Sequence, residues 1–527
     1  MRAVPYILFG IIIVILLPFF IRGIGFDSNE LFFTDKDFIA SLYRSFVFAI
    51  LSSFIVAIFS FIVATLLENV SIFSNSGKNL SFLILPFCLG NTAIAFLFKL
   101  VLEGTPFFDK IVTQGGYSVL GILLLIQVWQ YLFLFVYIIW IGNQNIPINK
   151  INYFKINNLG FYQRLKDLYL PNSKNLLILV SLIVFIFSFY EGAKSQFIFK
   201  ASAGTQTELV SNYLERSYKS MSLVSPQFAT DQLYAKGLML FVCVVIVLFL
   251  YFLIINWFSN KTVNLKLFYK LKQPSSIKGG SVIVWIFIAL IFAPLITAFL
   301  KFDFAFSQES LEIFVPVIYT LFAAIITTIV AILFSVSIRL FWSRAMSGFN
   351  KKSILVFIGL FLLNIIPPIC ILITGFYWMK IMSYNNDFTI VLSWIIGHVI
   401  LTLPLLTTFL LVTHFRFKNN ELFFLKTHKV NNSTIIKRSF LQRFKIDYLL
   451  VFIFAFAFIW SEDILNNIFS DNIKTFASSM KMYIYGKSAD TAKAFVFLLI
   501  SLFLAGFCIM LWRKIISKIM RNNTTND

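Results

Sequence analysis

Twelve apolar stretches, each close to the thickness of a bilayer, dominate this chain of 527 residues and limit how it can fold. A helix needs about 20 apolar residues to cross the hydrocarbon core of a membrane. Only 13% of the residues are charged, whereas charged residues supply about a quarter of a typical soluble protein. We therefore expect an all-α polytopic membrane protein. The expected spans are 5–24, 45–67, 80–102, 119–142, 176–198, 237–257, 281–300, 314–338, 354–378, 388–413, 448–465 and 493–512.

The basic residues gather in alternate loops. The segments after the fourth, sixth, eighth, tenth and twelfth spans carry an excess of Lys and Arg, and the segments between them are balanced or acidic. Because Lys and Arg accumulate on the cytoplasmic side of a membrane, this pattern predicts that both termini are cytoplasmic. It also explains the formal net charge of +21 without a nucleic-acid partner.

The two halves of the chain are related by an offset of 271 residues. Matches at this offset pair Lys155 with Lys426, Lys166 with Lys437, Leu170 with Leu441, Phe185 with Phe456, Phe187 with Phe458, and Glu191 with Glu462. Six spans per half is an even number, so both halves must cross the membrane in the same direction, as two parallel six-helix repeats. We expect a first transmembrane domain at 1–259, a cytoplasmic linker at 260–280 and a second transmembrane domain at 281–527.

Residues for covalent chemistry are missing from the sequence. There is no Gly-x-x-x-x-Gly-Lys-Ser/Thr motif for binding ATP, and no His-Glu-x-x-His or paired cysteines for zinc. The four cysteines lie in apolar stretches without paired spacing. His398 lies inside the tenth span, where it could line a pathway or form an ordinary interior hydrogen bond. We expect no enzymatic activity, no metal and no bound cofactor.

The basic loop at 143–175 carries a recognisable pattern. Asn158-Leu159-Gly160 is followed by Arg164, Lys166 and Leu170-Pro171. This spacing resembles the cytoplasmic loop of ABC-importer permeases, in which two short helices meet at a turn and dock into a cleft of the ATPase. A glycine permits the turn, and a proline suits the first turn of the next helix. The Glu-Ala-Ala residues of the family pattern are absent here.

The second loop, 415–447, is a degenerate copy. It has Asn431 in place of the glycine and Gln442 in place of the proline, although Asn also tolerates a left-handed turn. The resemblance assigns ATPase coupling to the following residues of the two loops: Gly160, Arg164, Lys166, Leu170, Pro171, Asn431, Lys437, Arg438 and Leu441.

The resemblance implies the permease subunit of a type I ABC importer with both transmembrane domains fused in one chain, as in ferric-iron and thiamine permeases. The stretch 129–171 is equally similar to sugar permeases, so the implied substrates are ferric iron, thiamine or a sugar. The implied partners are two copies of a separate ATP-binding subunit and an extracytoplasmic solute-binding protein. The implied location is the bacterial inner membrane.

Two acidic positions near the outer ends of spans allow more than one interpretation. Glu191 and Glu462 either face a solute pathway or a docked binding protein, or reach interfacial water as simple end caps. Two rival functions also stay open. A secondary carrier driven by an ion gradient would need acids deep in the spans, and a non-transporting scaffold would use the basic loops to bind anionic lipid.

Overall fold

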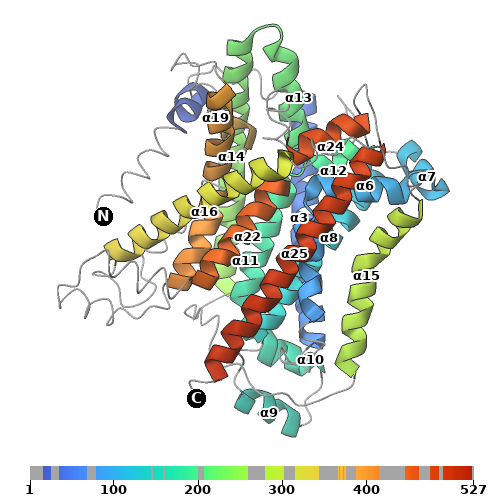
Figure 1. Ribbon diagram of the computed structural model, residues 1–527, viewed down its shortest axis with the longest axis vertical. Coiled ribbons are helices and arrows are strands. Elements are labelled where there is room, and N and C mark those ends of the chain that lie inside the picture. Colours follow the sequence, from blue (N-terminus) through green and yellow to red (C-terminus); the bar gives the residue numbers. More distant parts are fainter. Residues whose placement is uncertain are drawn as a thin grey trace. The chain divides into compact units, whose positions relative to one another are not determined.

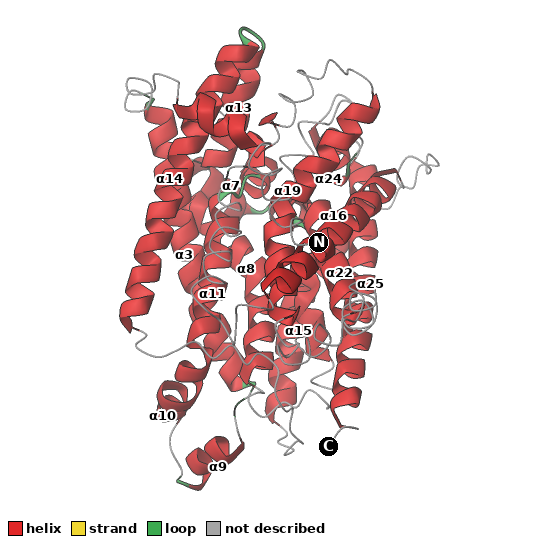
Figure 2. Ribbon diagram, turned by 90° about the vertical axis from the view of Figure 1, so that its left-hand side faces the viewer, coloured by secondary structure: helices red, strands yellow, loops and turns green. Residues whose placement is uncertain are grey.

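The computed structural model describes most of the chain, and its described residues form helices joined by short turns, without a strand (Figure 2). The described residues are 16–24, 35–67, 79–114, 116–143, 146, 148–157, 161–199, 207–258, 279–301, 315–342, 366, 368–371, 373–374, 387–414, 445–461, 475–485 and 491–524.

The helices are labelled in Figure 1. Those before residue 200 are α3 (Lys36–Leu66), the 3₁₀ helix η1 (Leu80–Ile84), α5 (Leu85–Cys88), α6 (Asn91–Leu102), α7 (Pro106–Gln114), α8 (Tyr117–Asn143), α9 (Ile148–Ile156), α10 (Phe161–Arg164), the π-helix η2 (Leu165–Tyr169), α11 (Leu170–Phe189) and α12 (Ala193–Phe199). The remainder are α13 (Val210–Ser222), α14 (Pro226–Phe258), α15 (Gly279–Lys301), α16 (Val315–Trp342), α19 (Asp387–His414), α22 (Lys445–Ser461), α24 (Phe476–Tyr485) and α25 (Thr491–Thr524).

Six described helices are long and apolar enough to cross a membrane: Lys36–Leu66, Tyr117–Trp140, Pro226–Val247, Val284–Lys301, Val315–Ile338 and Thr491–Leu511. The number rises to eight if each of two sharply bent helix pairs counts as one span. The predicted spans at 388–413 and 448–465 correspond to shorter apolar segments, Val391–Leu403 and Val451–Trp460. The chain is therefore an all-α, multi-pass membrane protein, and the count of twelve spans stays a prediction.

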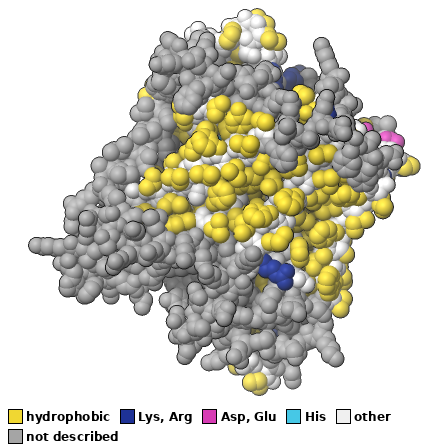
Figure 3. Space-filling view, viewed as in Figure 1, with side chains coloured by type: hydrophobic (Ala, Val, Ile, Leu, Met, Phe, Trp, Pro, Cys, Tyr) yellow, Lys and Arg dark blue, Asp and Glu magenta, His cyan; other side chains and the backbone are white. Residues whose placement is uncertain are grey.

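Helix α3 shows how the sequence adapts to lipid. Its buried face carries serines, among them Ser41, Ser45 and Ser60, while Phe54 and Phe59 are more than half exposed. Small residues inside let neighbouring helices approach closely, and lipid accepts the apolar residues outside. Several of these hydroxyls donate to a carbonyl three residues earlier in the helix, which satisfies the polar group locally. Hydrophobic side chains likewise cover much of the described surface in Figure 3.

Two compact units make up the fold, and each combines parts of both predicted halves. One unit contains Met1–Lys36, Tyr213–Val247 and Ser307–Ala494. The other contains Asp37–Asn212, Leu248–Phe306 and Phe495–Asp527. Each unit thus joins the central spans of one half to the first and last spans of the other. The boundaries at 1–259, 260–280 and 281–527 stay a prediction about the repeat in the sequence.

The helix bounds support that repeat. Adding 271 to the bounds of α8 gives 388–414, against Asp387–His414 for α19. The same shift moves α11 to 441–460, close to α22 at Lys445–Ser461. In their own unit, α16, α19 and α22 pack against one another. Their counterparts in the other unit do the same, since α8 packs on α11 and the rings of Phe46 in α3 and Phe189 in α11 are 4.8 Å apart.

Hydrogen bonds from side chains to backbone carbonyl groups connect α15 to other helices of its unit. Pro294 lies inside α15 and has no N–H to donate to the carbonyl of Leu290, four residues earlier. The Trp129 Nε1–H of α8 donates to that carbonyl at 3.2 Å. At the end of α15, Lys301 Nζ donates to the carbonyls of Val101 and Glu103 at 2.8 and 3.1 Å, near the C-terminal end of α6. An ammonium is favourable there because the carbonyl end of a helix is negative.

Candidate functional site: a buried lysine–glutamate cluster between two broken helices

The first broken helix bends at Gly90. The segments Leu80–Cys88 and Asn91–Leu102 meet at an angle of 94°. Gly90 has φ 80° and ψ 157°, a conformation that is essentially restricted to glycine. The predicted continuous span at 80–102 is therefore two segments, and Asn91 begins the second of them.

The second break separates α11 from α12 and consists of residues 190–192. A Cβ on Gly192 would lie 2.8 Å from Asn212 Oδ1, so any larger residue would force the Asn212 side chain, in the first turn of α13, to move. That turn also holds the break in place, because Ser211 Oγ donates to the carbonyl of Tyr190 at 2.9 Å and Asn212 Nδ2 donates to Ser195 Oγ. The chain therefore leaves the apolar helix α11 and starts again as α12.

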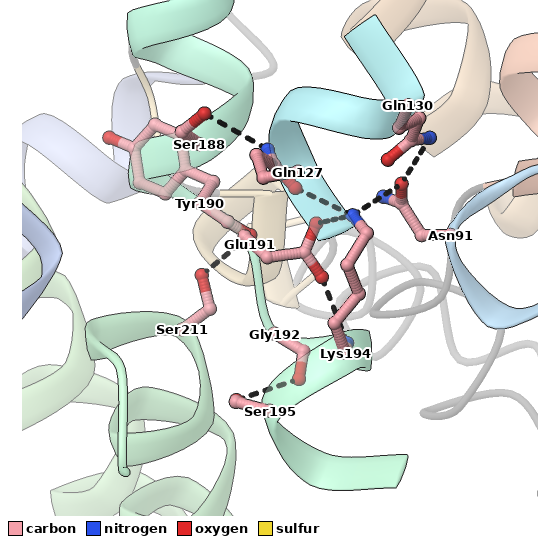
Figure 4. Close-up of polar contacts among 10 residues, drawn as sticks. All are labelled: Asn91, Gln127, Gln130, Ser188, Tyr190, Glu191, Gly192, Lys194, Ser195 and Ser211. Carbon is pink, nitrogen blue, oxygen red and sulfur yellow. Dashed lines mark hydrogen bonds and ion pairs between the residues drawn. The ribbon is translucent and has the colours of Figure 1, made fainter. Parts of the chain in front are cut away.

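An ion pair with no exposed surface connects the two breaks. Lys194 Nζ lies 2.5 Å from Glu191 Oε2, and both side chains are 0% exposed. The other carboxylate oxygen of Glu191 accepts the backbone N–H of Lys194 at 3.0 Å. Lys194 Nζ also donates to Gln127 Oε1 at 2.7 Å and to Asn91 Oδ1 at 3.3 Å (Figure 4). The cluster thus joins α6, α8 and α12, which all belong to one compact unit.

Further hydrogen bonds fix the direction of the two amide groups. Gln127 Nε2 donates to Ser188 Oγ at 2.9 Å, so its oxygen is directed towards Lys194. Gln130 Nε2 donates to Asn91 Oδ1 at 2.9 Å. Figure 4 shows these groups converging on the ammonium from separate helices. The oxygens of Asn91, Gln127 and Glu191 therefore form an oxygen cage around Lys194 Nζ.

A fully buried charge pair is costly to form, because both ions lose their hydration. It persists when the charges are paired closely and their other donors and acceptors are satisfied. Here both carboxylate oxygens of Glu191 and the ammonium of Lys194 have partners, whereas Gln130 Oε1 is buried without a hydrogen bond among the described residues. The cluster offers no nucleophile beside a general base, and among the described residues no group of three or more His, Cys, Asp or Glu could hold a metal ion. The ion pair of Lys194 and Glu191 can hold the segments on either side of the breaks together, and its loss would weaken that link.

The predicted coupling loop lies at the opposite end of α8 from Tyr117. It begins with α9 and continues through α10 and η2 into α11. Tyr153, Ile156 and Tyr162 are 61, 78 and 73% exposed. Lys166 and Pro171 are exposed, Leu170 is 40% exposed and Arg164 is half-buried. Helix α9 is a separate short helix, whereas α10 continues through η2 into α11 without a non-helical residue, and Pro171 lies in the first turn of α11. The coupling role of these residues stays a prediction.

Several predicted site residues lie outside the described part of the chain. These are Gly160 in the first loop, Asn431, Lys437, Arg438 and Leu441 in the second loop, and Glu462. Glu191 is described, and it lies in the buried cluster rather than at an exposed helix end. Whether it faces a solute pathway stays a prediction. His398 is buried, and the ring of Trp394 contacts its ring edge-on at 4.7 Å.

A second buried lysine lies in the other compact unit. Lys236 Nζ in α14 is 2.7 Å from Asp35 Oδ2, just before α3. The hydroxyl of Tyr213 in α13 contacts both groups, donating to Asp35 and accepting from Lys236. Burial, assisted by Asp35, raises the pKa of the Tyr213 phenol well above its ordinary value, so it serves as a neutral donor. Together these contacts connect three segments at one end of α14.

The sequence interpretation identified Glu191 but missed its partners. A single continuous span at 176–198 would place Glu191 and Lys194 on one helix face, three residues apart, and that spacing was the available signal. Nothing local pointed to Asn91 or Gln127, because the break at Gly90 brings Asn91 into the cluster. Gln127 stands 271 positions before His398, so the repeat marks the position but not its role.

No protein-family model and no curated protein matches this sequence. A function must therefore be argued from the helices, the loop and the buried cluster themselves.

Proposed function

We propose that this chain is the permease subunit of an ATP-driven ABC importer, forming a solute pathway and coupling to separate ATPase subunits. The observation that carries the proposal is the loop between α8 and α11. It contains the short helix α9 and the four-residue helix α10, which continues through η2 into α11, beyond the long apolar helices of its unit (Figure 1). These short helices expose Tyr153, Ile156 and Tyr162 instead of burying them.

Exposed apolar side chains at this place favour a protein partner. Aromatic residues are enriched where proteins contact each other. In a loop that contacted only water, we would expect polar residues at these positions, or aromatic residues with buried rings. The exposed Lys166 adds positive charge beside them. A groove on an ATPase that takes two short helices and their basic flank fits this surface. The family resemblance of Asn158-Leu159-Gly160 and Leu170-Pro171 supports the same partner.

The finer parts of the proposal follow from the sequence. They are twelve spans in two parallel repeats, cytoplasmic termini, a bacterial inner membrane, a second ATPase copy at 415–447, and a binding protein that delivers ferric iron, thiamine or a sugar. In this scheme the chain itself performs no covalent chemistry and needs no cofactor. Closing of the ATPase dimer would move both loops and, through the helices, open the pathway.

The test uses the chain purified from its native membranes with the proteins bound to it. ATP hydrolysis should co-purify with the wild type and fall strongly in Tyr153→Glu and Tyr162→Glu, because a buried carboxylate in the contact is unfavourable. Tyr117→Glu is the matched control, since Tyr117 is 77% exposed at the other end of α8. Equal hydrolysis in all four preparations, or none with the wild type, would contradict the proposal.

A secondary carrier is the second candidate, because a buried ion pair at the interruption between α11 and α12 contacts Asn91, next to the helix break at Gly90. Broken helices and intramembrane charges mark ion and substrate sites in such carriers. The chain alone, reconstituted in liposomes, would then accumulate solute when an ion gradient is imposed. An ABC permease without its ATPase would not.

A further inference from the structure

The oxygen cage of Asn91, Gln127 and Glu191 has the chemistry of a binding site for a primary ammonium group. A carboxylate and two amide oxygens surround one point, and each accepts a hydrogen bond from the same nitrogen. Three acceptors match the three N–H donors of an ammonium ion. The cage therefore selects for charge and for the number of donors together.

The cage is held in shape by residues other than Lys194. Ser188 fixes the amide of Gln127, and Gln130 fixes that of Asn91. Glu191 follows α11, and the contact of Ser211 with the Tyr190 carbonyl holds the neighbouring backbone. Removal of the lysine side chain would therefore leave three oriented oxygens with a net negative charge, rather than a collapsed space. Such a preorganised site loses little freedom when an ion binds.

We propose that this cage is a primary-ammonium site whose resident cation is the Lys194 side chain. Lys194 acts as a tethered ligand. While it occupies the cage, it connects α12 to α6 and α8, and so keeps both helix breaks in their present arrangement. When it leaves, the cage can accept a free primary amine, and the breaks at 90 and 190–192 lose the ammonium that links them.

The experiment is chemical rescue of Lys194→Ala. The quantity measured is the thermal unfolding temperature (Tm) of the full-length protein in detergent. The variant should unfold several degrees below the wild type, because it leaves the Glu191 carboxylate buried without its partner. Methylammonium carries the same three donors as the lost side chain and should raise the Tm of the variant in a saturable manner. It should leave the wild type unchanged, because its cage is already filled.

Three controls separate the cage from general salt effects. Tetramethylammonium has the same charge but no N–H donor, and should not rescue Lys194→Ala. The double variant Lys194→Ala/Glu191→Gln removes the negative charge and should unfold at a higher temperature than Lys194→Ala, without a response to methylammonium. Lys219→Ala removes a half-exposed lysine paired with Glu215 at 2.7 Å, and it should show a much smaller loss of Tm and no rescue.

If Lys194→Ala yields no folded protein, expression in medium with methylammonium provides the same readout as recovered yield. A variant that gains neither Tm nor yield from methylammonium overturns the proposal, as does equal rescue by tetramethylammonium. None of these measurements involves transport or an ATPase, so the result stands apart from the proposed function. Loss of ATPase coupling with an intact rescue would contradict only the proposed function.

Discussion

Two lysines are buried among the residues that the structure describes, and they are neutralised in different ways. Lys194 and its partner Glu191 are both 0% exposed, so no water shares the charge. Lys236 is 2% exposed, but its partner Asp35 is 24% exposed. If its contact with Lys236 is removed, the Asp35 carboxylate can accept hydrogen bonds from water instead. Protein groups alone balance the first pair, whereas solvent helps to balance the second. The first should therefore be far more sensitive to loss of one member.

The largest expected effect follows from Glu191→Leu. Removing the carboxylate leaves the Lys194 ammonium buried without a counter-charge, which typically costs about 3–5 kcal/mol. The double variant Glu191→Leu/Lys194→Met should recover most of that loss, because it replaces the ion pair by apolar groups of similar size. Thermal unfolding of the two single variants and the double variant gives the coupling energy. A double variant no more stable than the singles would show that packing, and not charge, dominates this site.

A smaller effect is expected for Asp35→Asn. The asparagine keeps an acceptor for Tyr213 and Lys236, and the partly exposed position lets water solvate what remains. We expect a loss of about 1–2 kcal/mol, in the range of a charge-assisted hydrogen bond. The same unfolding assay applies, with Asp231→Asn as a control at another partly exposed ion pair. A loss as large as that of Glu191→Leu would remove the distinction between the two lysines.

Gly192→Ala tests how tightly the second helix break is packed. The added Cβ would lie 2.8 Å from Asn212 Oδ1, so the asparagine must move away from Ser195. Overpacking of this kind costs about 1–3 kcal/mol. Shortening the neighbour in Gly192→Ala/Asn212→Ser should return part of the stability. Gly121→Ala is a control, because a Cβ there meets nothing within 4 Å. Equal stability of Gly192→Ala and Gly121→Ala would contradict the close approach.

The smallest effect belongs to the surface. Glu215 and Lys219 form an ion pair at 2.7 Å on α13, and the lysine side chain is 49% exposed. Exposed pairs contribute about 0–1 kcal/mol, and salt screens them. Lys219→Ala should therefore lower stability by less than 1 kcal/mol, and the difference should shrink in high salt. A loss that grows with salt would show that the lysine contributes through packing instead.

The approximate positions of several membrane-spanning helices could be predicted, because the hydropathy of a span depends only on residues that are close together in the chain. The described helices at Lys36–Leu66, Tyr117–Trp140 and Val315–Ile338 lie where the apolar stretches predicted spans. Short helices before Pro171 were implied by the resemblance of this loop to that of ABC-importer permeases, and the residues that carry the resemblance are close together in the chain. The bounds of α8 and α19 agree with the offset of 271 residues that was read from the sequence.

The candidate site was predicted only in part. Glu191 was singled out, but its burial was not, since an acid near a predicted helix end could equally have reached water. Lys194 is only three positions after Glu191 in the chain, so this pair was visible in the sequence. The contact between Lys236 and Asp35 spans 201 residues, and no local pattern indicates such a pairing.

The sequence by itself determined that this protein lies in a membrane as helices, roughly where several of its apolar spans lie, and that a related pattern returns in its second half. These properties depend on residues adjacent in the chain and on their transfer from water to lipid. Only the tertiary structure decided that spans break at Gly90 and before α12, that Lys194 meets oxygens from α6, from α8 and from the segment between α11 and α12, and that each compact unit combines both halves. Those outcomes depend on which distant groups can satisfy a buried charge or a free carbonyl, and that is settled by packing.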